Sequence, residues 1–161
     1  VERSRGLGDV YKRQDINTGE ISWKSKVGNG GTLGGVHFGM TTDNKNLYVP
    51  ISDRKVNKDY DNDAKPGLYA LDFEDGDILW EYQLDDICKS RKALHGEGKC
   101  STGFSAAISM TNNVIFAGAL DGRFSAHASE DGSKLWEFDT LKDFVTINGM
   151  PAVGGLSLIH I

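Results

Sequence analysis

Three tryptophans that recur at a nearly constant step constrain the fold of this chain more than any other feature. Trp23, Trp80 and Trp136 are 57 and 56 residues apart, and each ends a similar segment. Residues 70–80 read Ala-Leu-Asp-Phe-Glu-Asp-Gly-Asp-Ile-Leu-Trp, and residues 126–136 read Ala-His-Ala-Ser-Glu-Asp-Gly-Ser-Lys-Leu-Trp. A shorter copy, Asp-Ile-Asn-Thr-Gly-Glu-Ile-Ser-Trp, occupies residues 15–23. Three such copies indicate an internal repeat in which each copy is one structural unit.

Each copy has the pattern of a strand, a tight turn and a second strand. Alternating apolar residues precede the turn and resume after it, as half-buried strands require. Gly19, Gly76 and Gly132 occupy the same turn position, where a positive φ is free of penalty only for glycine. A β-hairpin repeat of this length predicts the blades of a propeller.

The remaining segments complete these blades. Residues 36–41 and 46–51 are predicted as an inner strand and its partner, and residues 68–72 and 79–84 as the outer strands of the same blade. A second blade is predicted from four strands at 104–110, 114–120, 123–129 and 135–139, and residues 144–152 begin the inner strand of another. No segment has the periodicity of a helix. The chain is therefore expected to be all-β.

The two ends of the chain resemble translated sequencing-adaptor DNA. Residues 9–14 (Asp-Val-Tyr-Lys-Arg-Gln) can be encoded by GAT GTG TAT AAG AGA CAG. The reverse complement of that DNA encodes Leu-Ser-Leu-Ile-His-Ile, the sequence of residues 156–161. We therefore expect residues 1–14 and 156–161 to be non-native and residues 15–155 to be a fragment read from a metagenomic library. The alternative is a genuine basic N-terminal arm.

Charge and hydropathy exclude two classes of partner. The net charge is −5, and it becomes −7 without the first fourteen residues, which hold four basic and two acidic side chains. An acidic chain without a basic stripe argues against nucleic acid as a partner. No apolar run reaches the ~18 residues that a membrane span needs.

Three local patterns have competing interpretations. The glycine-rich run 28–35 lacks the Gly-Lys-Ser/Thr ending of a phosphate loop and is better explained as a flexible connection. Asp59, Asp61 and Asp63 alternate like calcium ligands, but Ala64 and Ala70 stand where an EF-hand needs Gly and Glu, which favours a solvated polar insertion over 52–67. Cys88 and Cys100 lie in a second polar insertion, 85–103; a disulfide is the favoured interpretation, and two unpaired thiols are the alternative.

The repeated pattern Ala-x-Asp-x-x-x-Gly-x-x-x-Trp resembles the tryptophan-docking motif of the pyrroloquinoline quinone (PQQ) propeller repeat. Asp15 and Asp72 match its acidic position, whereas Ala128 departs from it, so that copy is expected to dock less firmly. The resemblance implies a seven- or eight-bladed ring, of which this chain would form about two to three four-stranded antiparallel blades. It also implies that Trp23, Trp80 and Trp136, with Gly19, Gly76 and Gly132, are structural residues that dock neighbouring blades.

A narrower resemblance rests on several further segments. It is carried by Gly-Val-His-Phe-Gly-Met (35–40), Pro-Gly-Leu-Tyr-Ala-Leu-Asp (66–72), Cys-Ser-Thr-Gly-Phe-Ser-Ala-Ala (100–107), Phe-Ala-Gly-Ala-Leu-Asp-Gly (116–122) and Asn-Gly-Met-Pro-Ala (148–152). Together these are similar to the propeller of polyvinyl-alcohol dehydrogenase-like quinoproteins. That resemblance implies a PQQ-dependent oxidoreductase that acts on small or polymeric alcohols, passes electrons to a cytochrome c, uses calcium as a Lewis acid and is periplasmic or secreted.

The resemblance also directs attention to residues at the starts of inner strands. His37, Ser105 and Asn148 are the cofactor-binding candidates, and Asp53, Arg54 and Asp143 are weaker ones. Each has a structural alternative: His37 as a hydrogen-bonded channel filler, Asp53 and Arg54 as a solvated pair. The calcium ligands and the catalytic base are expected in missing blades. The second functional hypothesis is a non-catalytic propeller scaffold of the outer-membrane assembly or sensor type, so enzyme activity is left open.

Overall fold

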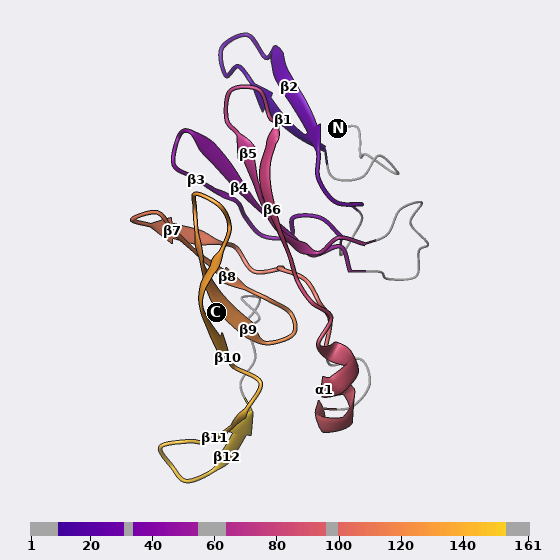
Figure 1. Cartoon of the computed structure of the whole chain (residues 1–161), viewed down its shortest axis with the longest axis vertical. Coiled ribbons are helices and arrows are strands. Elements are labelled where there is room, and N and C mark those ends of the chain that lie inside the picture. The colour runs from indigo at the N-terminus through magenta and orange to yellow at the C-terminus, as the bar shows by residue number, and fades with distance from the viewer. Residues whose placement is uncertain (1–9, 31–33, 55–63, 96–99, 154–161) are drawn as a thin grey trace.

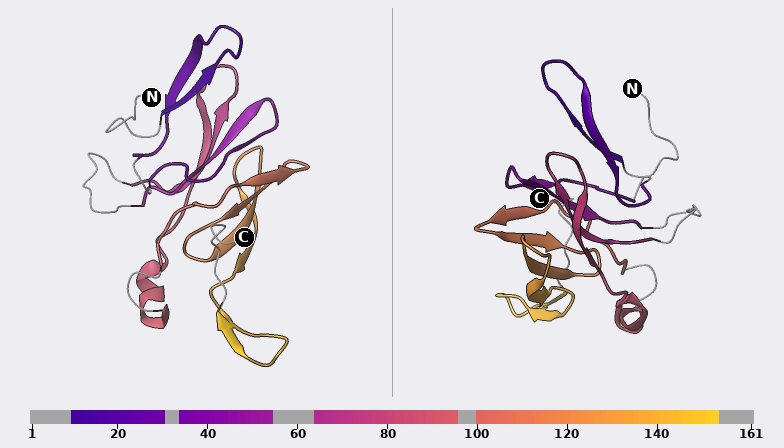
Figure 2. Two further views of the ribbon diagram at one scale, coloured as in Figure 1. Left: turned by 180° about the vertical axis from the view of Figure 1, so that it is seen from behind. Right: turned by 45° about the horizontal axis from the view of Figure 1, so that its top comes forward.

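The computed structural model describes residues 10–30, 34–54, 64–95 and 100–153 (Figure 1). Its central elements are two four-stranded antiparallel sheets, with strand orders β3-β4-β5-β6 and β7-β8-β9-β10. Two-stranded sheets, β1-β2 and β11-β12, precede and follow them. The sheets succeed one another along the molecule as neighbouring layers, with β1-β2 at one end and β11-β12 at the other (Figures 1 and 2). This is the architecture of a partial β-propeller.

The strand and helix bounds follow the repeat. The elements are β1 (Val10–Gln14), β2 (Ile21–Lys26), β3 (Thr41–Thr42), β4 (Asn46–Ile51), β5 (Gly67–Asp72), β6 (Ile78–Gln83), α1 (Cys88–His95), β7 (Ser109–Thr111), β8 (Val114–Gly118), β9 (Arg123–Ala128), β10 (Lys134–Asp139), β11 (Asp143–Val145) and β12 (Pro151–Val153).

Alternating side chains of the β3–β6 blade supply two separate cores. Val49 and Tyr69 pack with Trp23 in the seam toward β1-β2. Tyr48 and Leu68 point the other way and pack with residues of the β7–β10 blade, among them Phe104. Because successive strand residues face opposite sides, one blade fills both of its seams from the same two strands.

The inner strands are shorter than expected. The predicted strand 36–41 is regular only as β3, and the predicted strand 104–110 is replaced by β7 and an isolated bridge between Phe104 and Ala119. The reason is that backbone groups here bond to the partner strand or the next blade at single points: Ser52 N–H donates to Gly35 O (2.9 Å) and Ile108 N–H to Gly39 O (3.4 Å). These scattered bonds satisfy the backbone without a continuous ladder.

Helix α1 corrects the expectation that no helix is present. Its eight residues lie in the second polar insertion, and the structure places its Cys88 in a disulfide with Cys100 (S–S 2.05 Å). Arg91 forms a bidentate ion pair with Asp139, with distances of 3.0 and 2.7 Å, and also donates to Asp121 O at 2.9 Å. Tertiary contacts of this kind fix a helix too short to be stable alone.

Two terminal segments also differ in detail from the expectations. Residues 144–152 form most of a hairpin, β11-β12, in place of one inner strand. Val10–Gln14, part of the adaptor-like segment, pair with β2 as strand β1. Within the described residues, no helix has the length and apolar character needed to cross a bilayer.

Candidate functional site

The first two tryptophans dock on the next blade through a five-residue turn. We call Asp15–Gly19, Asp72–Gly76 and Ala128–Gly132 the docking turns; in each, the glycine N–H donates to the first residue's carbonyl, at 2.9, 3.0 and 3.0 Å. The Trp23 indole N–H donates to Phe73 O at 3.1 Å, and the Trp80 indole N–H donates to Ser129 O at 3.0 Å. Both acceptors are the second residue of a docking turn, so the two seams are built alike.

The glycine of the turn is required for this contact. A Cβ on Gly76 would lie 2.5 Å from the Trp23 ring, and a Cβ on Gly132 would lie 2.5 Å from the Trp80 ring. Their φ angles of +80° and +72° add a second reason for glycine. The contact persists at the turn that begins with Ala128, although the Asp72 side chain caps its own turn through Glu74 N–H (2.7 Å) and Ala128 has no such group.

The structure brings two of the three cofactor-binding candidates together. His37 precedes β3, Ser105 precedes β7, and His37 Nδ1 lies 2.7 Å from Ser105 Oγ. Ser105 is buried, with 5% of its surface exposed. The other ring nitrogen, His37 Nε2, is buried and has no hydrogen-bond partner within the described residues. A buried ring nitrogen without a partner is costly unless a ligand or water completes it.

Asn148 lies apart from this pair, as does Asp143. Asn148 occupies the exposed turn between β11 and β12, and the exposed Asp143 begins β11. The prediction for Asn148 was the start of an inner strand. In the structure it lies in the turn of a hairpin, which is closed by a hydrogen bond from Thr146 N–H to Met150 O.

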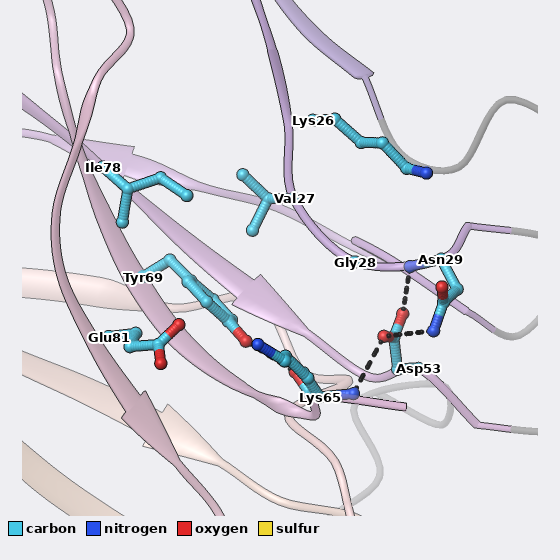
Figure 3. Close-up of a pocket in the computed structure, with 9 residues that line it drawn as sticks. All are labelled: Lys26, Val27, Gly28, Asn29, Asp53, Lys65, Tyr69, Ile78 and Glu81. Atoms are coloured by element: carbon cyan, nitrogen blue, oxygen red, sulfur yellow. Dashed lines mark hydrogen bonds between the residues drawn. The ribbon is translucent and has the colours of Figure 1, made fainter. Parts of the chain in front are cut away.

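Asp53 is a buried residue that ties loops together (Figure 3). Its Oδ1 accepts from Asn29 N–H at 2.8 Å and Gly35 N–H at 3.4 Å, and its Oδ2 accepts from Asn29 Nδ2 and Lys65 N–H, both at 3.2 Å. Four donors from three segments occupy the carboxylate. Its role in the structure is therefore to anchor the loops around a cavity of ≈ 460 Å³ between β2 and β6.

The wall of this cavity is a buried tyrosine. Tyr69 donates its hydroxyl proton to Lys65 O at 2.7 Å, and burial, with help from the carboxylates of Glu81 and Asp53, raises the pKa of its phenol above the ordinary range. Tyr69 therefore stays a protonated donor, and Val27 and Ile78 line the cavity beside it (Figure 3).

A second cavity, of ≈ 710 Å³, lies where the two polar insertions meet. Arg54, Ala64 and Pro66 line it from the first insertion, and Asp86, Ser101, Thr102 and the Cys88–Cys100 disulfide line it from the second. Next to the second insertion, the backbone at Gly103 packs closely on Ser52, since a Cβ on Gly103 would lie 2.4 Å from Ser52 O. The charged and hydroxyl groups of the cavity suit a polar, hydroxylated ligand.

Two buried polar groups were missed by the sequence analysis. His127 is fully buried; its Nδ1 lies 3.0 Å from Gly132 O and its Nε2 2.8 Å from Ser125 Oγ. Since a carbonyl only accepts, Nδ1 carries the proton, and burial lowers the pKa of the ring. Asp121 and Arg123 form a buried ion pair at 2.6 Å, and Arg123 also donates to Asp85 O at 2.8 Å. The sequence held one indication that His127 is special: it occupies the repeat position at which the preceding copy has the apolar Leu71.

Metal ligands are not assigned in this chain. Within the part that the structure describes, no three His, Cys, Asp or Glu side chains come together to hold a metal ion. The aspartates at 59, 61 and 63 lie outside the described residues, as does part of the glycine-rich run.

Comparison with known proteins agrees with this architecture. A family model for the PQQ-type repeat, described as outer membrane protein assembly factor BamB, matches residues 7–156. The chain therefore belongs to this PQQ-repeat family.

Two curated relatives that match this chain are dehydrogenases. The chain is 38% identical over 151 residues to a polyvinylalcohol dehydrogenase from a Pseudomonas species, with 92% of this chain and 22% of the relative covered. A polyvinylalcohol dehydrogenase from a Sphingopyxis species is 33% identical over 150 residues, with the same coverage. The chain thus spans about a fifth of these relatives' length. A solved quinohemoprotein alcohol dehydrogenase from Pseudomonas putida shares the fold, with a TM-score of 0.57, 17% identity, and 83% of this chain and 18% of that chain covered.

Proposed function

We propose that this chain is part of a PQQ-dependent dehydrogenase that oxidises alcohols, is periplasmic or secreted, and passes electrons to a cytochrome c. The observation that carries the proposal is the similarity to two polyvinylalcohol dehydrogenases over 92% of the chain. The cavity between the two insertions supports it, because Arg54, Asp86 and Thr102 in its lining offer polar groups to a hydroxylated substrate.

The residues present fit a bound PQQ at one point. When bound, PQQ supplies a quinone that accepts two electrons from the alcohol. If Ser105 Oγ–H donates to His37 Nδ1, then Nε2–H is left as a donor for a cofactor oxygen, and Ser105 holds the ring in that orientation. We therefore retain His37 and Ser105 as cofactor-binding residues. Asn148 is kept as a weaker candidate, and calcium is assigned to no residue here.

The test is performed on the intact protein encoded by the full open reading frame. With PQQ and calcium added, we expect dye reduction that depends on an alcohol. His37→Ala should weaken PQQ binding, followed by fluorescence quenching, at least about tenfold, the value of one lost charge-assisted hydrogen bond. Ser109→Ala, at an exposed position of β7, is the matched control. No alcohol-dependent reduction in the loaded protein would reject the enzyme.

The alternative is a non-catalytic propeller scaffold. The description of the matching family model as an outer membrane assembly factor supports it. A full reading frame with a lipoprotein signal and blades without further insertions would favour the scaffold, whereas a haem-attachment motif would favour the dehydrogenase.

A further inference from the structure

The contact between His37 and Ser105 joins two different blades, so it depends on what holds their backbones in register. His37 precedes β3 of one blade, and Ser105 precedes β7 of the next. His37 Nδ1 and Ser105 Oγ are 2.7 Å apart, and a pair that separates by about 1 Å from such a distance is no longer hydrogen-bonded. One short stretch of chain, residues 51–53, contacts both backbones.

On the histidine side, this stretch holds Gly35, two positions before His37. Ser52 N–H donates to Gly35 O at 2.9 Å. Gly35 N–H in turn donates to Asp53 Oδ1 at 3.4 Å. Gly35 is buried and has a φ of +70°, so these two bonds fix a backbone that glycine would otherwise leave free to turn.

On the serine side, the same stretch holds the two residues that precede Ser105. Phe104 N–H donates to Ile51 O at 3.2 Å, and the Phe104 side chain is fully buried. Gly103 packs so closely on Ser52 that an added Cβ would lie 2.4 Å from Ser52 O. Residues 51–53 therefore place both backbones of the pair.

Asp53 is the residue on which this stretch depends. Its φ of +41° lies in the left-handed region, which residues with a side chain seldom adopt. Such a conformation persists only where surrounding contacts hold it. The buried carboxylate supplies those contacts, because it accepts hydrogen bonds from Asn29 and Lys65 (Figure 3) and from Gly35.

We propose that Asp53 is a positioning residue, which fixes the His37 ring against Ser105 so that Nε2 keeps the orientation in which it can bind PQQ. Asp53 acts through Gly35 and Ser52, since its own oxygens are occupied by four protein donors. The inference rests on the cofactor-binding role proposed above for the His37–Ser105 pair. It adds the residue that holds the two blades' contributions together.

The first test observes the His37 ring in the 161-residue chain with ¹⁵N-labelled histidine. At pH 8, where histidine is mostly neutral, two-bond ¹H–¹⁵N spectra distinguish the two ring tautomers. We expect one tautomer in the wild type, because Ser105 Oγ is a fixed partner for Nδ1. Asp53→Gly tolerates the positive φ but removes the carboxylate, so it should give a mixture of tautomers. Asp53→Asn, which keeps an acceptor oxygen for Gly35 N–H, should retain the single tautomer.

The second test measures PQQ binding by the intact protein encoded by the full reading frame. Asp53→Gly should weaken binding about tenfold, and its double variant with His37→Ala should bind no more weakly than His37→Ala alone. A residue that acted only on overall stability would make the two losses additive. Asn44→Gly is the matched control, because Asn44 also has a positive φ (+70°) but lies in the exposed turn between β3 and β4. It should change neither the tautomer nor the affinity.

Any of four results would overturn the inference. They are a His37 spectrum that Asp53→Gly leaves unchanged, a tautomer mixture in Asp53→Asn or in Asn44→Gly, and additive losses of affinity in the double variant. If the wild type does not bind PQQ, the proposed function fails, and the tautomer comparison alone decides the role of Asp53. Near-ultraviolet circular dichroism establishes that each variant is folded. If Asp53→Gly is not, Asp53→Ser replaces it, because its shorter side chain should also release Gly35 and give the mixture.

Discussion

The β3–β6 blade and the β7–β10 blade share a strand order, yet they differ in burial. The first is packed on both faces: Trp23 docks on its turn, and its own Trp80 docks on the next one. The second is packed on one face, and its Trp136 remains half exposed. The difference shows that a blade's tryptophan is buried by its neighbour and not by its own sheet. A blade is therefore a unit of repetition whose stability comes from its seams.

The largest expected effect follows from removing the docked indole. Trp80→Ala should lower the free energy of unfolding by about 3 kcal/mol, because this partly buried indole packs in the seam and its N–H is bonded, whereas Trp136→Ala should cost about 1 kcal/mol or less. Urea unfolding of both variants measures the pair. Equal losses of stability in the two variants would contradict the view that docking on a neighbouring blade is what makes Trp80 stabilising.

The second seam also carries a covalent tie that the first lacks. The disulfide Cys88–Cys100 closes the insertion that joins β6 to β7. Its removal in Cys88→Ala with Cys100→Ala should cost about 3 kcal/mol in the chain-entropy picture. Arg91→Met is the companion variant, because it keeps the chain stem and removes the ion pair to Asp139. If the double cysteine variant were as stable as the wild type, the disulfide would not stabilise this seam.

A matched pair of glycine substitutions isolates docking from backbone strain. Gly132→Ala and Gly19→Ala both place a side chain at a positive φ, but only the former puts a Cβ 2.5 Å from an indole. We expect Gly132→Ala to be worse by about 1–3 kcal/mol, the usual cost of overpacking. Thermal unfolding of the two variants gives the difference in stability directly. A difference near zero would mean that the docking turn accommodates the added methyl group without loss of stability.

The smallest effect is the pH dependence that His127 gives to the second blade. His127 has a pKa lowered from its ordinary 6.5, mainly by burial, so below pH 6.5 the unfolded chain binds a proton that the folded chain refuses. Stability should therefore be constant above that pH and fall below it, by at most about 1.4 kcal/mol per unit. Comparing unfolding at pH 7.5 and 5.5 tests this. His127→Leu, which copies Leu71 of the preceding blade, should lose the dependence; a variant that keeps it would assign the proton elsewhere.

The repeat step made much of the fold predictable. Trp23, Trp80 and the glycine turns mark each hairpin, because a strand–turn–strand pattern depends on local residue types. The inner strands were predicted too long, because Gly35 and Gly39 bond outside a regular ladder, which no local pattern reports.

The site was less predictable for a physical reason. The sequence could propose His37 and Ser105 only by position within the repeat, and their contact depends on how adjacent blades stack. Helix α1 was missed because Arg91–Asp139, an ion pair across 48 residues, fixes it. His127 was missed because its two partners become visible only once the turn at Gly132 closes on it.

The most direct test of blade-to-blade docking is hydrogen exchange of the three indole N–H groups, followed by ¹H–¹⁵N spectra. The account predicts slow exchange for Trp23 and Trp80, whose N–H groups are bonded to Phe73 O and Ser129 O, and fast exchange for Trp136. Similar rates for all three tryptophans, or a protected Trp136 beside two exposed ones, would contradict it.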